Sequence, residues 1–435
     1  MNTPINNTIV EEKLKALKLK GGLDTATIRE IVRLVNEIEL ATSERFIRME
    51  MGVPGLNPPK LLIDAEIEAL KSGVASKYPN IEGVKELKEE ASRFAKLFID
   101  IDIPPQNIVP TVGSMQSGFA AFLVAQRLDQ KKNKVLFIDP GFPVQKQQCD
   151  VIGIQYESFD VYDYRGDKLR GKLEEYFKTG EFSTVIYSSP NNPTWIVFTE
   201  EELKIIGELA NKYDVIVLED LAYFAMDFRV DYSVPGEPPF HPTVARYTDN
   251  YILMISASKV FSFAGERLGL LMVSPVLYEK EYPYLKNHFK TGKFGYSLIF
   301  GSLYALSAGV NHSAQVAFAK MLKAVNDGEY KITQDVLHYG EKAKTMKELF
   351  TKYGFEIVYD KDVDRPIADG FYFTINYPGM DTNTLMEELL KYGISAISLK
   401  ITGSQKEGIR ACVSQVMPEQ FPVLEERLKL FKANH

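Results

Sequence analysis

The chain has 435 residues, of which 45% are hydrophobic and 25% charged, so it carries enough apolar side chains for a folded core and is not disordered. Its length predicts two domains, and its net charge of −7 argues against a nucleic-acid-binding surface. Two cysteines cannot make a disulfide framework in a chain this long, and the five histidines form no metal-binding group. Because no apolar run is long enough to cross a bilayer, we expect a cytoplasmic protein without a membrane partner.

A helix is predicted near the N-terminus, with Asp24 or Thr25 as its cap. Residues 49–59 then contain several prolines and glycines, which indicate a turn-rich crossing between structural units. The apolar residues that recur at helical spacing are Ile28, Ile31, Val32, Leu34, Val35 and Ile38.

From Leu61 to Phe300 the sequence alternates helical stretches, such as Glu200–Tyr213, with short apolar runs. Runs that are apolar throughout are typical of strands buried on both faces. The sequence therefore predicts an α/β fold, in which a mostly parallel sheet is covered by helices on both faces. The predicted strands are Val135–Asp139, Thr184–Ser188, Val215–Asp220, Tyr251–Ser256 and Leu268–Val273.

The remainder of the chain predicts a long helix over residues 301–323, and then an α+β tail with strands near Phe371–Asn376 and Ile409–Ser414. We expect a large domain over residues 56–305. A smaller α+β domain is expected to comprise residues 306–435, with the N-terminal segment 1–55 packed against it.

Chemistry-bearing residues follow the predicted strands. Lys259 comes shortly after one of them, beside small hydroxyl residues, and Arg267 lies eight positions on. Ligands of parallel sheets bind beyond the carboxyl ends of the strands. A lysine whose pKa is lowered there forms a Schiff base, which suits an aldehyde cofactor carrying a phosphate. The alternative, for Lys259 or Arg267 alone, is an ordinary solvated charge.

Asp220 ends the run before a phenol, Tyr223, and Asn192 follows another strand. A carboxylate here would keep a pyridine nitrogen protonated, while Tyr223 and Asn192 hydrogen-bond the ring's phenolic oxygen. The alternatives are a helix cap or turn for Asp220 and turn chemistry for Asn192.

Residues 111–116 form a turn that opens an apolar helix, expected from about Met115 to Leu128. Free backbone N–H groups and the Ser114 hydroxyl would bind phosphate there, and Ser256 and Arg267 would complete the site. A capped helix without a ligand is the alternative. Phe142 is placed to stack on a planar cofactor, although core packing is the commoner role of phenylalanine.

Taken together, these motifs resemble the class I/II aminotransferases, fold-type-I enzymes that use pyridoxal 5'-phosphate (PLP). Each motif alone is common, but their order and spacing are specific. They are Gly52–Pro54, Lys77–Gly83, Gly113–Gln116, Asp139–Pro143, Asn191–Thr194, Asp220–Tyr223, Ser256–Lys259, Arg267–Gly269, Gly370–Tyr372 and Gly408–Arg410.

The resemblance implies a role for each matching residue in the large, PLP-binding domain and around it. Lys259 would form the internal aldimine, and Asp220 would pair with the pyridine nitrogen. Substrate carboxylate would bind to Arg410, helped by Asn192 and the backbone of Gly52. The remaining cofactor contacts implied are Asn192 and Tyr223 at the phenolic oxygen, Phe142 on the ring, and Ser114, Met115, Gln116, Ser256 and Arg267 around the phosphate.

The resemblance also implies a homodimer, because Tyr78 in this family reaches the phosphate of the neighbouring subunit's cofactor. Two positions depart from the family pattern. Trp195 stands where glycine is usual, and is expected either to reshape the substrate mouth or to pack beneath the neighbouring helix. Met115 stands where some relatives that accept dicarboxylates carry lysine, which favours a neutral or aromatic amino donor.

The expected activity is ping-pong transfer of an amino group from an L-amino acid to a 2-oxo acid such as 2-oxoglutarate. An alternative with the same lysine, aspartate and arginine is a C–S β-lyase acting on cysteine conjugates such as cystathionine. A transcriptional regulator with a borrowed aminotransferase domain is disfavoured, because the first 50 or so residues are too few and insufficiently basic for a DNA-binding domain.

Overall fold

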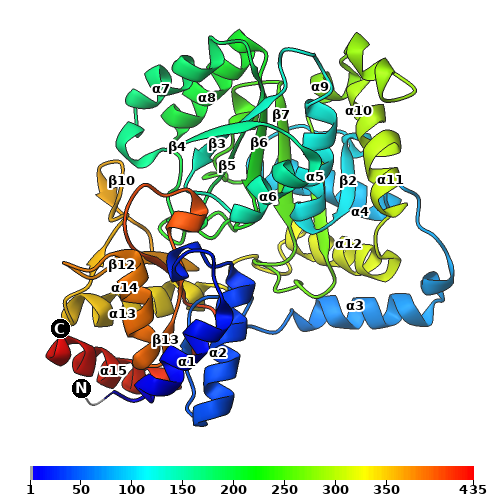
Figure 1. Ribbon diagram of the computed structural model, residues 1–435. Coiled ribbons are helices and arrows are strands. Elements are labelled where there is room, and N and C mark those ends of the chain that lie inside the picture. The colour runs from blue at the N-terminus through cyan, green and yellow to red at the C-terminus, as the bar shows by residue number, and fades with distance from the viewer. Residues whose placement is uncertain (1–2) are drawn as a thin grey trace.

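The computed structural model describes residues 3–435. Figure 1 shows a large sheet with its helices in the upper body, and a smaller unit below it that combines the two ends of the chain. No helix within residues 3–435 is both long and apolar enough to span a membrane.

A seven-stranded sheet forms the centre of the large unit, in the order β2-β8-β7-β6-β5-β3-β4. Neighbouring strands from β4 to β7 are parallel, while β8 runs antiparallel to both β7 and β2. The prediction of a mostly parallel sheet is confirmed. The strands are β2 (Ile108–Val112), β3 (Lys134–Asp139), β4 (Tyr156–Asp160), β5 (Phe182–Ser188), β6 (Ile216–Leu221), β7 (Tyr251–Ser256) and β8 (Leu268–Val273).

Helices cover both faces of this sheet, as the continuously apolar strands require. Ile216 and Leu218 point to the face covered by α5, α6 and α9, whereas Val217 and Leu221 point to the face covered by α7, α8 and α12. The helices of this unit are α3 (Lys60–Lys71), α4 (Lys85–Phe94), α5 (Gly113–Ala125), α6 (Pro143–Ile152), α7 (Lys168–Phe177), α8 (Glu200–Tyr213), α9 (Pro275–Glu279), α10 (Phe294–Tyr296), α11 (Tyr304–Ser307) and α12 (His312–Asn326).

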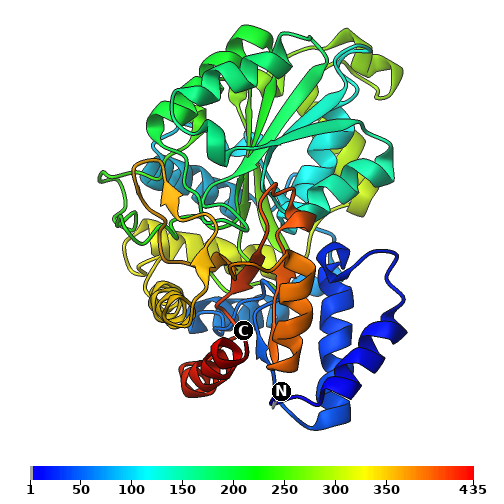
Figure 2. The same cartoon turned by 60° about the vertical axis from the view of Figure 1, so that its left-hand side comes forward.

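The smaller unit joins the N-terminal segment to the C-terminal region, as Figure 2 shows from a second side. Ile47 in β1 pairs with Ile394 in β13, and a separate antiparallel sheet has the order β14-β15-β12-β9. The domain boundaries at residues 55 and 305 stay predictions. The strands are β1 (Ile47–Arg48), β9 (Glu356–Ile357), β10 (Lys361–Asp362), β11 (Arg365–Pro366), β12 (Tyr372–Asn376), β13 (Ile394–Ser395), β14 (Ile397–Ser398) and β15 (Ile409–Cys412), and the helices are α1 (Asn7–Leu17), α2 (Ile28–Thr42), α13 (Leu337–Lys352), α14 (Thr382–Lys391) and α15 (Phe421–Asn434).

Three sequence-based details are wrong. The cap of α2 is Thr27, which forms a capping box with Glu30, because residues 23–25 instead make a short 3₁₀ turn. The expected helix over residues 301–323 is interrupted after Ser307, where Ala308 takes a positive φ, and α12 begins afresh at His312. Helix α5 spans Gly113–Ala125, so it begins two residues and ends three residues earlier than expected.

Candidate active site

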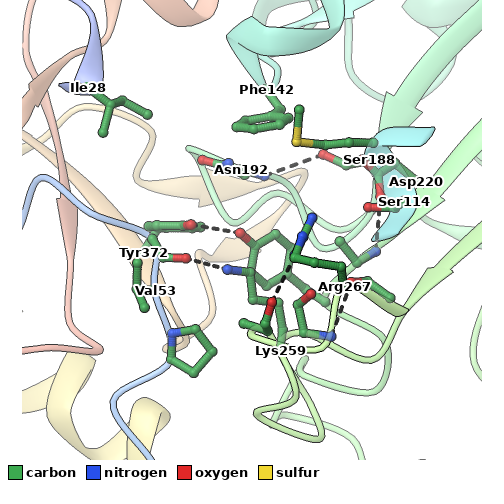
Figure 3. A pocket seen from close by; sticks show the side chains of 18 of the residues that line it. Ile28, Val53, Ser114, Phe142, Ser188, Asn192, Asp220, Lys259, Arg267 and Tyr372 are labelled. Atoms are coloured by element: carbon green, nitrogen blue, oxygen red, sulfur yellow. Dashed lines mark hydrogen bonds between the residues drawn. The ribbon is translucent and has the colours of Figure 1, made fainter. Parts of the chain in front are cut away.

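A cavity of about 490 Å³ lies between the carboxyl ends of the parallel strands, the N-terminal segment and the smaller unit. Figure 3 shows side chains from all three regions converging on it. The structure therefore brings together most of the residues predicted from sequence. Those that line the cavity are Gly52, Ser114, Met115, Phe142, Asn192, Asp220, Tyr223, Ser256, Lys259, Arg267 and Arg410.

Lys259 lies in the turn that follows β7, and its side chain enters the cavity. The Nζ atom donates a hydrogen bond to the carbonyl oxygen of Gly52 and lies 5.3 Å from the ring centroid of Phe371. Burial lowers the pKa of Lys259 to about 8, and the nearby Arg410 and Arg267 guanidinium groups act in the same direction. Near neutral pH this side chain therefore supplies a useful fraction of free amine, the form that acts as a nucleophile or base.

Asp220 lies near the end of β6 and is held by two donors. Its Oδ1 accepts from the Ala222 backbone N–H at 3.1 Å, and its Oδ2 accepts from Gln145 Nε2 at 2.9 Å. Burial raises the pKa of Asp220 to about 6, against the opposing effect of those hydrogen bonds. At pH 7 the carboxylate form therefore predominates, and it lines the cavity.

Several hydrogen-bond donors that suit an anion lie together at the N-terminus of α5. No side chain caps this helix end, so its first N–H groups are available to a ligand. Gly113 takes a φ of +66°, and a Cβ atom there would lie 2.6 Å from Arg267 Nη2, so glycine allows the guanidinium to approach the helix end. Ser114 and Ser256 add hydroxyl groups to the same part of the cavity wall. The combined donors suit a phosphate group.

Arg410, on β15, is only 1% exposed. Its Nη1 donates to Asn192 Oδ1 at 3.2 Å and its Nη2 donates to the Glu50 carbonyl oxygen at 2.6 Å, while its Nε has no partner among the described residues. No carboxylate within residues 3–435 forms an ion pair with it. A buried cation that is not neutralised by the protein is expected to bind an anionic ligand, and a guanidinium matches a carboxylate best.

Two predicted residues lie elsewhere. The Gln116 side chain accepts from the Val112 N–H at 2.7 Å and donates to Ser307 Oγ at 2.8 Å, so its amide is used at the helix end and does not line the cavity. Tyr78 is 92% exposed and borders a separate, open hollow near residues 307–313. Neither contacts the cofactor site of its own chain.

Trp195 does not form the mouth of the cavity, because its ring is fully buried. It packs edge-on against Tyr223 at 5.3 Å and Tyr372 at 6.1 Å between ring centroids, behind the cavity wall. An added Cβ atom at Gly370 would overlap the indole, so glycine is needed at that position. This residue therefore supports the tyrosines of the wall.

Sequence reasoning assigned no role to several residues that also line or support the cavity. Tyr372 hydrogen-bonds Tyr223, and Gln145 holds Asp220. Ile28 and Val53 line the wall opposite the sheet. Gln145 lies in the first turn of α6, after the Asp139–Pro143 motif, but an isolated glutamine gives no signal of what it will contact.

A mostly parallel sheet whose strand ends meet a cavity lined by a lysine, a buried carboxylate and a buried guanidinium is the arrangement of an enzyme active site. The family model for class I and II aminotransferases matches residues 45–428, and the chain belongs to this family. A probable aspartate aminotransferase of Methanocaldococcus jannaschii is 28% identical over 323 residues, which cover 74% of this chain and 78% of the relative. An aspartate aminotransferase of Pyrococcus horikoshii is 27% identical over 247 residues, covering 56% and 59% of the two chains.

The same fold is found among solved structures. A single-mutant aspartate aminotransferase of Thermus thermophilus aligns with a TM-score of 0.75 over 96% of this chain and 98% of the other. Because the two are only 17% identical, this likeness concerns the fold.

Proposed function

We propose that the protein uses PLP to move the amino group of an L-amino acid to a 2-oxo acid such as 2-oxoglutarate. The observation that carries the proposal is the presence of Lys259, Asp220 and Arg410, which has no carboxylate partner among the described residues, on the walls of one cavity. A lysine, a carboxylate and a buried guanidinium are the groups needed to react with, polarise and orient an amino acid.

The residues present fit PLP. The uncapped end of α5, with Arg267 held against Gly113, suits the phosphate, and the buried Asp220 suits a ring nitrogen. When bound, PLP supplies an aldehyde carbon that takes up the amino group and a ring that accepts electrons. The residues that would hold it are Ser114, the Met115 backbone, Ser256 and Arg267 at the phosphate, Asp220 at the nitrogen, Asn192 and Tyr223 at the phenolic oxygen, and Phe142 on the ring.

In the proposed reaction Lys259 would hold the cofactor until the substrate amine displaces it, and the freed amine would then carry the substrate Cα proton to the former aldehyde carbon of the cofactor. Asp220 stays ionised and keeps the ring nitrogen protonated. Arg410 fixes the substrate carboxylate, so that the Cα proton is presented to Lys259. A first substrate leaves as a 2-oxo acid before a second 2-oxo acid enters, which makes the kinetics ping-pong.

The amino donor is proposed to have a neutral or aromatic side chain. Three cations line the cavity, Lys259, Arg267 and Arg410, and each already has a proposed partner. The wall that remains for a substrate side chain is formed by Ile28, Val53 and other apolar groups. An aromatic-amino-acid aminotransferase of Thermococcus litoralis is among the relatives, at 28% identity over 265 residues, alongside enzymes named for aspartate.

The test is a screen of the purified, PLP-loaded protein against the common amino acids with 2-oxoglutarate, followed by incubation with cystathionine. New glutamate, formed fastest with neutral or aromatic donors, would support the proposal. Release of a thiol and pyruvate without glutamate would instead show the β-lyase reaction, and a preference for aspartate would contradict the proposed side-chain selectivity.

Replacing Arg410 tests the carboxylate site. We expect Arg410→Ala to raise KM for the amino donor by about 30- to 1000-fold, because one partner of a buried charge pair is lost. Arg427→Ala is a matched control, since Arg427 is also a buried arginine but donates only to the carbonyls of Gly393 and Arg45, outside the cavity. Steady-state kinetics give KM for the amino donor in both variants. An unchanged KM in Arg410→Ala would contradict the assignment of Arg410 to the substrate carboxylate.

We further propose a homodimer in which Tyr78 completes the partner's site, which accounts for a tyrosine that is almost fully exposed. Sedimentation should give twice the mass of the chain. Tyr78→Ala and Lys259→Ala chains, each weakly active or inactive alone, should regain activity when refolded together, because a mixed dimer contains one intact site. A monomer, or no recovery on mixing, would refute shared sites.

A further inference from the structure

Tyr372 occupies a central place in the cavity wall and has no part in the reaction proposed above. It begins β12 and is buried. Its hydroxyl forms a hydrogen bond of 2.7 Å with the hydroxyl of Tyr223; Tyr372 is labelled in Figure 3. This is the only hydrogen bond that the Tyr223 hydroxyl makes to another described residue. Tyr372 therefore controls the environment of a group proposed to contact the cofactor.

The ring of Tyr372 also supports Arg410. The guanidinium carbon lies 4.5 Å from the ring centroid, a cation–π distance. The two residues come from neighbouring antiparallel strands, in which Tyr372 pairs with Cys412 and Arg410 pairs with Thr374. The aromatic face thus lies against a cation whose two terminal nitrogens donate to Asn192 and to the Glu50 carbonyl.

The backbone at Gly52, whose carbonyl accepts from Lys259, also contacts Tyr372. A Cβ atom on Gly52 would overlap the Tyr372 hydroxyl, so the backbone passes directly against that oxygen. The Gly52 carbonyl in turn accepts from Lys259 Nζ. The Tyr372 side chain is thereby in contact with Tyr223, with Arg410 and with the Gly52 backbone that accepts from Lys259.

The position of the Tyr372 ring is fixed from behind. Trp195 packs edge-on against both tyrosines, and Phe371 lies 5.1 Å from the Tyr372 ring and 5.6 Å from that of Tyr223, between centroids. Close packing of this kind leaves little room for another rotamer. The hydroxyl is therefore held in one place.

We infer that Tyr372 is a positioning residue, which directs the Tyr223 hydroxyl toward the phenolic oxygen of the bound cofactor and holds the Arg410 guanidinium toward the substrate carboxylate. The inference rests on the proposed function. A tyrosine hydroxyl has a single proton, so when Tyr223 donates to an anionic oxygen, Tyr372 must be the donor to Tyr223. Donors in such a chain polarise one another, which strengthens the bond to the anion.

The first test separates the hydroxyl of Tyr372 from its ring. In Tyr372→Phe holoenzyme we expect the pH midpoint of the bound cofactor's visible absorbance to rise by about 0.3 to 1 unit, because the anionic ring oxygen loses stabilisation. KM for the amino donor should stay unchanged, since the ring under Arg410 remains. The titratable and charged groups that face Tyr372 are Tyr223, Arg410 and Cys412, and all are kept in this variant.

Removing the aromatic ring of Tyr372 tests its cation–π contact with Arg410. Tyr372→Leu should shift the midpoint as Tyr372→Phe does and should also raise KM for the amino donor by roughly 3- to 30-fold, the range of a partly desolvated cation–π contact. Unchanged KM would overturn the role toward Arg410. Circular dichroism of each holoenzyme establishes that the fold is kept, and the conservative phenylalanine variant carries the test should the leucine variant unfold.

A double-mutant cycle tests whether Tyr372 acts through Tyr223. The midpoint shift caused by Tyr372→Phe should disappear in a Tyr223→Phe background, because Tyr372 then has no Tyr223 hydroxyl through which to act on the cofactor oxygen. Tyr339→Phe is the matched control: this tyrosine is also fully buried, but its hydroxyl accepts from the Gly55 N–H and does not reach Tyr223. It should leave the midpoint unchanged.

The outcomes are distinct. A Tyr372→Phe midpoint equal to the wild type, an equal shift in Tyr339→Phe, or a shift that persists without the Tyr223 hydroxyl would each overturn the role of Tyr372 and leave the proposed function intact. If the wild-type protein develops no visible band with PLP, the proposed cofactor is rejected and the inference falls with it.

Discussion

Lys259→Ala is expected to lower the rate of amino transfer by at least about 10⁴-fold while the fold survives. The loss is large because one amine is proposed both to hold the cofactor and to move the Cα proton, and proton transfer alone contributes up to about that factor. Single-turnover absorbance measurements give the rate. Borohydride reduction of the wild-type holoenzyme, followed by peptide mapping, should place the cofactor on Lys259.

Lys342→Met is the control for that variant. Lys342 is a second buried lysine, and burial lowers its pKa to about 8 as well, but its Nζ donates to the carbonyls of Ser414 and Val416 and does not enter the cavity. We expect lowered stability with the cofactor still bound to Lys259. Turnover near the wild-type rate in Lys259→Ala, or cofactor attached to Lys342, would refute the assignment.

Asp220→Asn is expected to reduce kcat by about a hundred- to a thousandfold, the usual cost of removing one buried electrostatic contact to the reacting system. The change is isosteric and preserves the packing at the end of β6, so the loss reports the missing negative charge. Without it a ring nitrogen in the cavity is no longer kept protonated. The cofactor should still be captured by Lys259, which its absorbance will show.

The neighbouring residue offers a matched control. Glu219 is also a buried carboxyl on β6, but it points to the opposite face of the sheet, where it accepts from Tyr187 and Thr243. Burial raises the pKa of Glu219 to about 7. Glu219→Gln should alter stability and leave kcat within a few-fold of the wild type. Equal losses in the two variants would mean that Asp220 acts through the fold and not through its charge.

Much of the large sheet could be predicted from sequence, since buried parallel strands are continuous apolar runs with sharp ends. Tyr251–Ser256 and Leu268–Val273 match their strands residue for residue. The antiparallel direction of β8 could not be predicted, because strand composition does not encode direction. The interruption at Ala308 was missed because alanine is a strong helix former, although Gly309 and Asn311, which caps α12, are local signals of a helix end and a new start.

The site was predicted where a residue's chemistry and its position after a strand coincide, as for Lys259 and Asp220. Gln116 shows the limit of that reasoning. It lies at the N-terminal end of α5, as predicted, yet its amide accepts a hydrogen bond from the Val112 N–H and donates one to the Ser307 hydroxyl. Tyr372 and Gln145 act through partners more than 70 residues away along the chain, so only the folded structure shows what they contact.

The pairing of Ile47 with Ile394 ties the first structural segment to one of the last. During synthesis on the ribosome, β1 emerges long before its partner β13 exists, and it stays unpaired until most of the polypeptide has been made. Closing so large a loop is slow, because its entropy is lost before the distant contacts form. Newly made chains should therefore remain able to bind chaperones until late in synthesis. A chain that is truncated before β15 would lack Arg410 and could not complete the smaller unit.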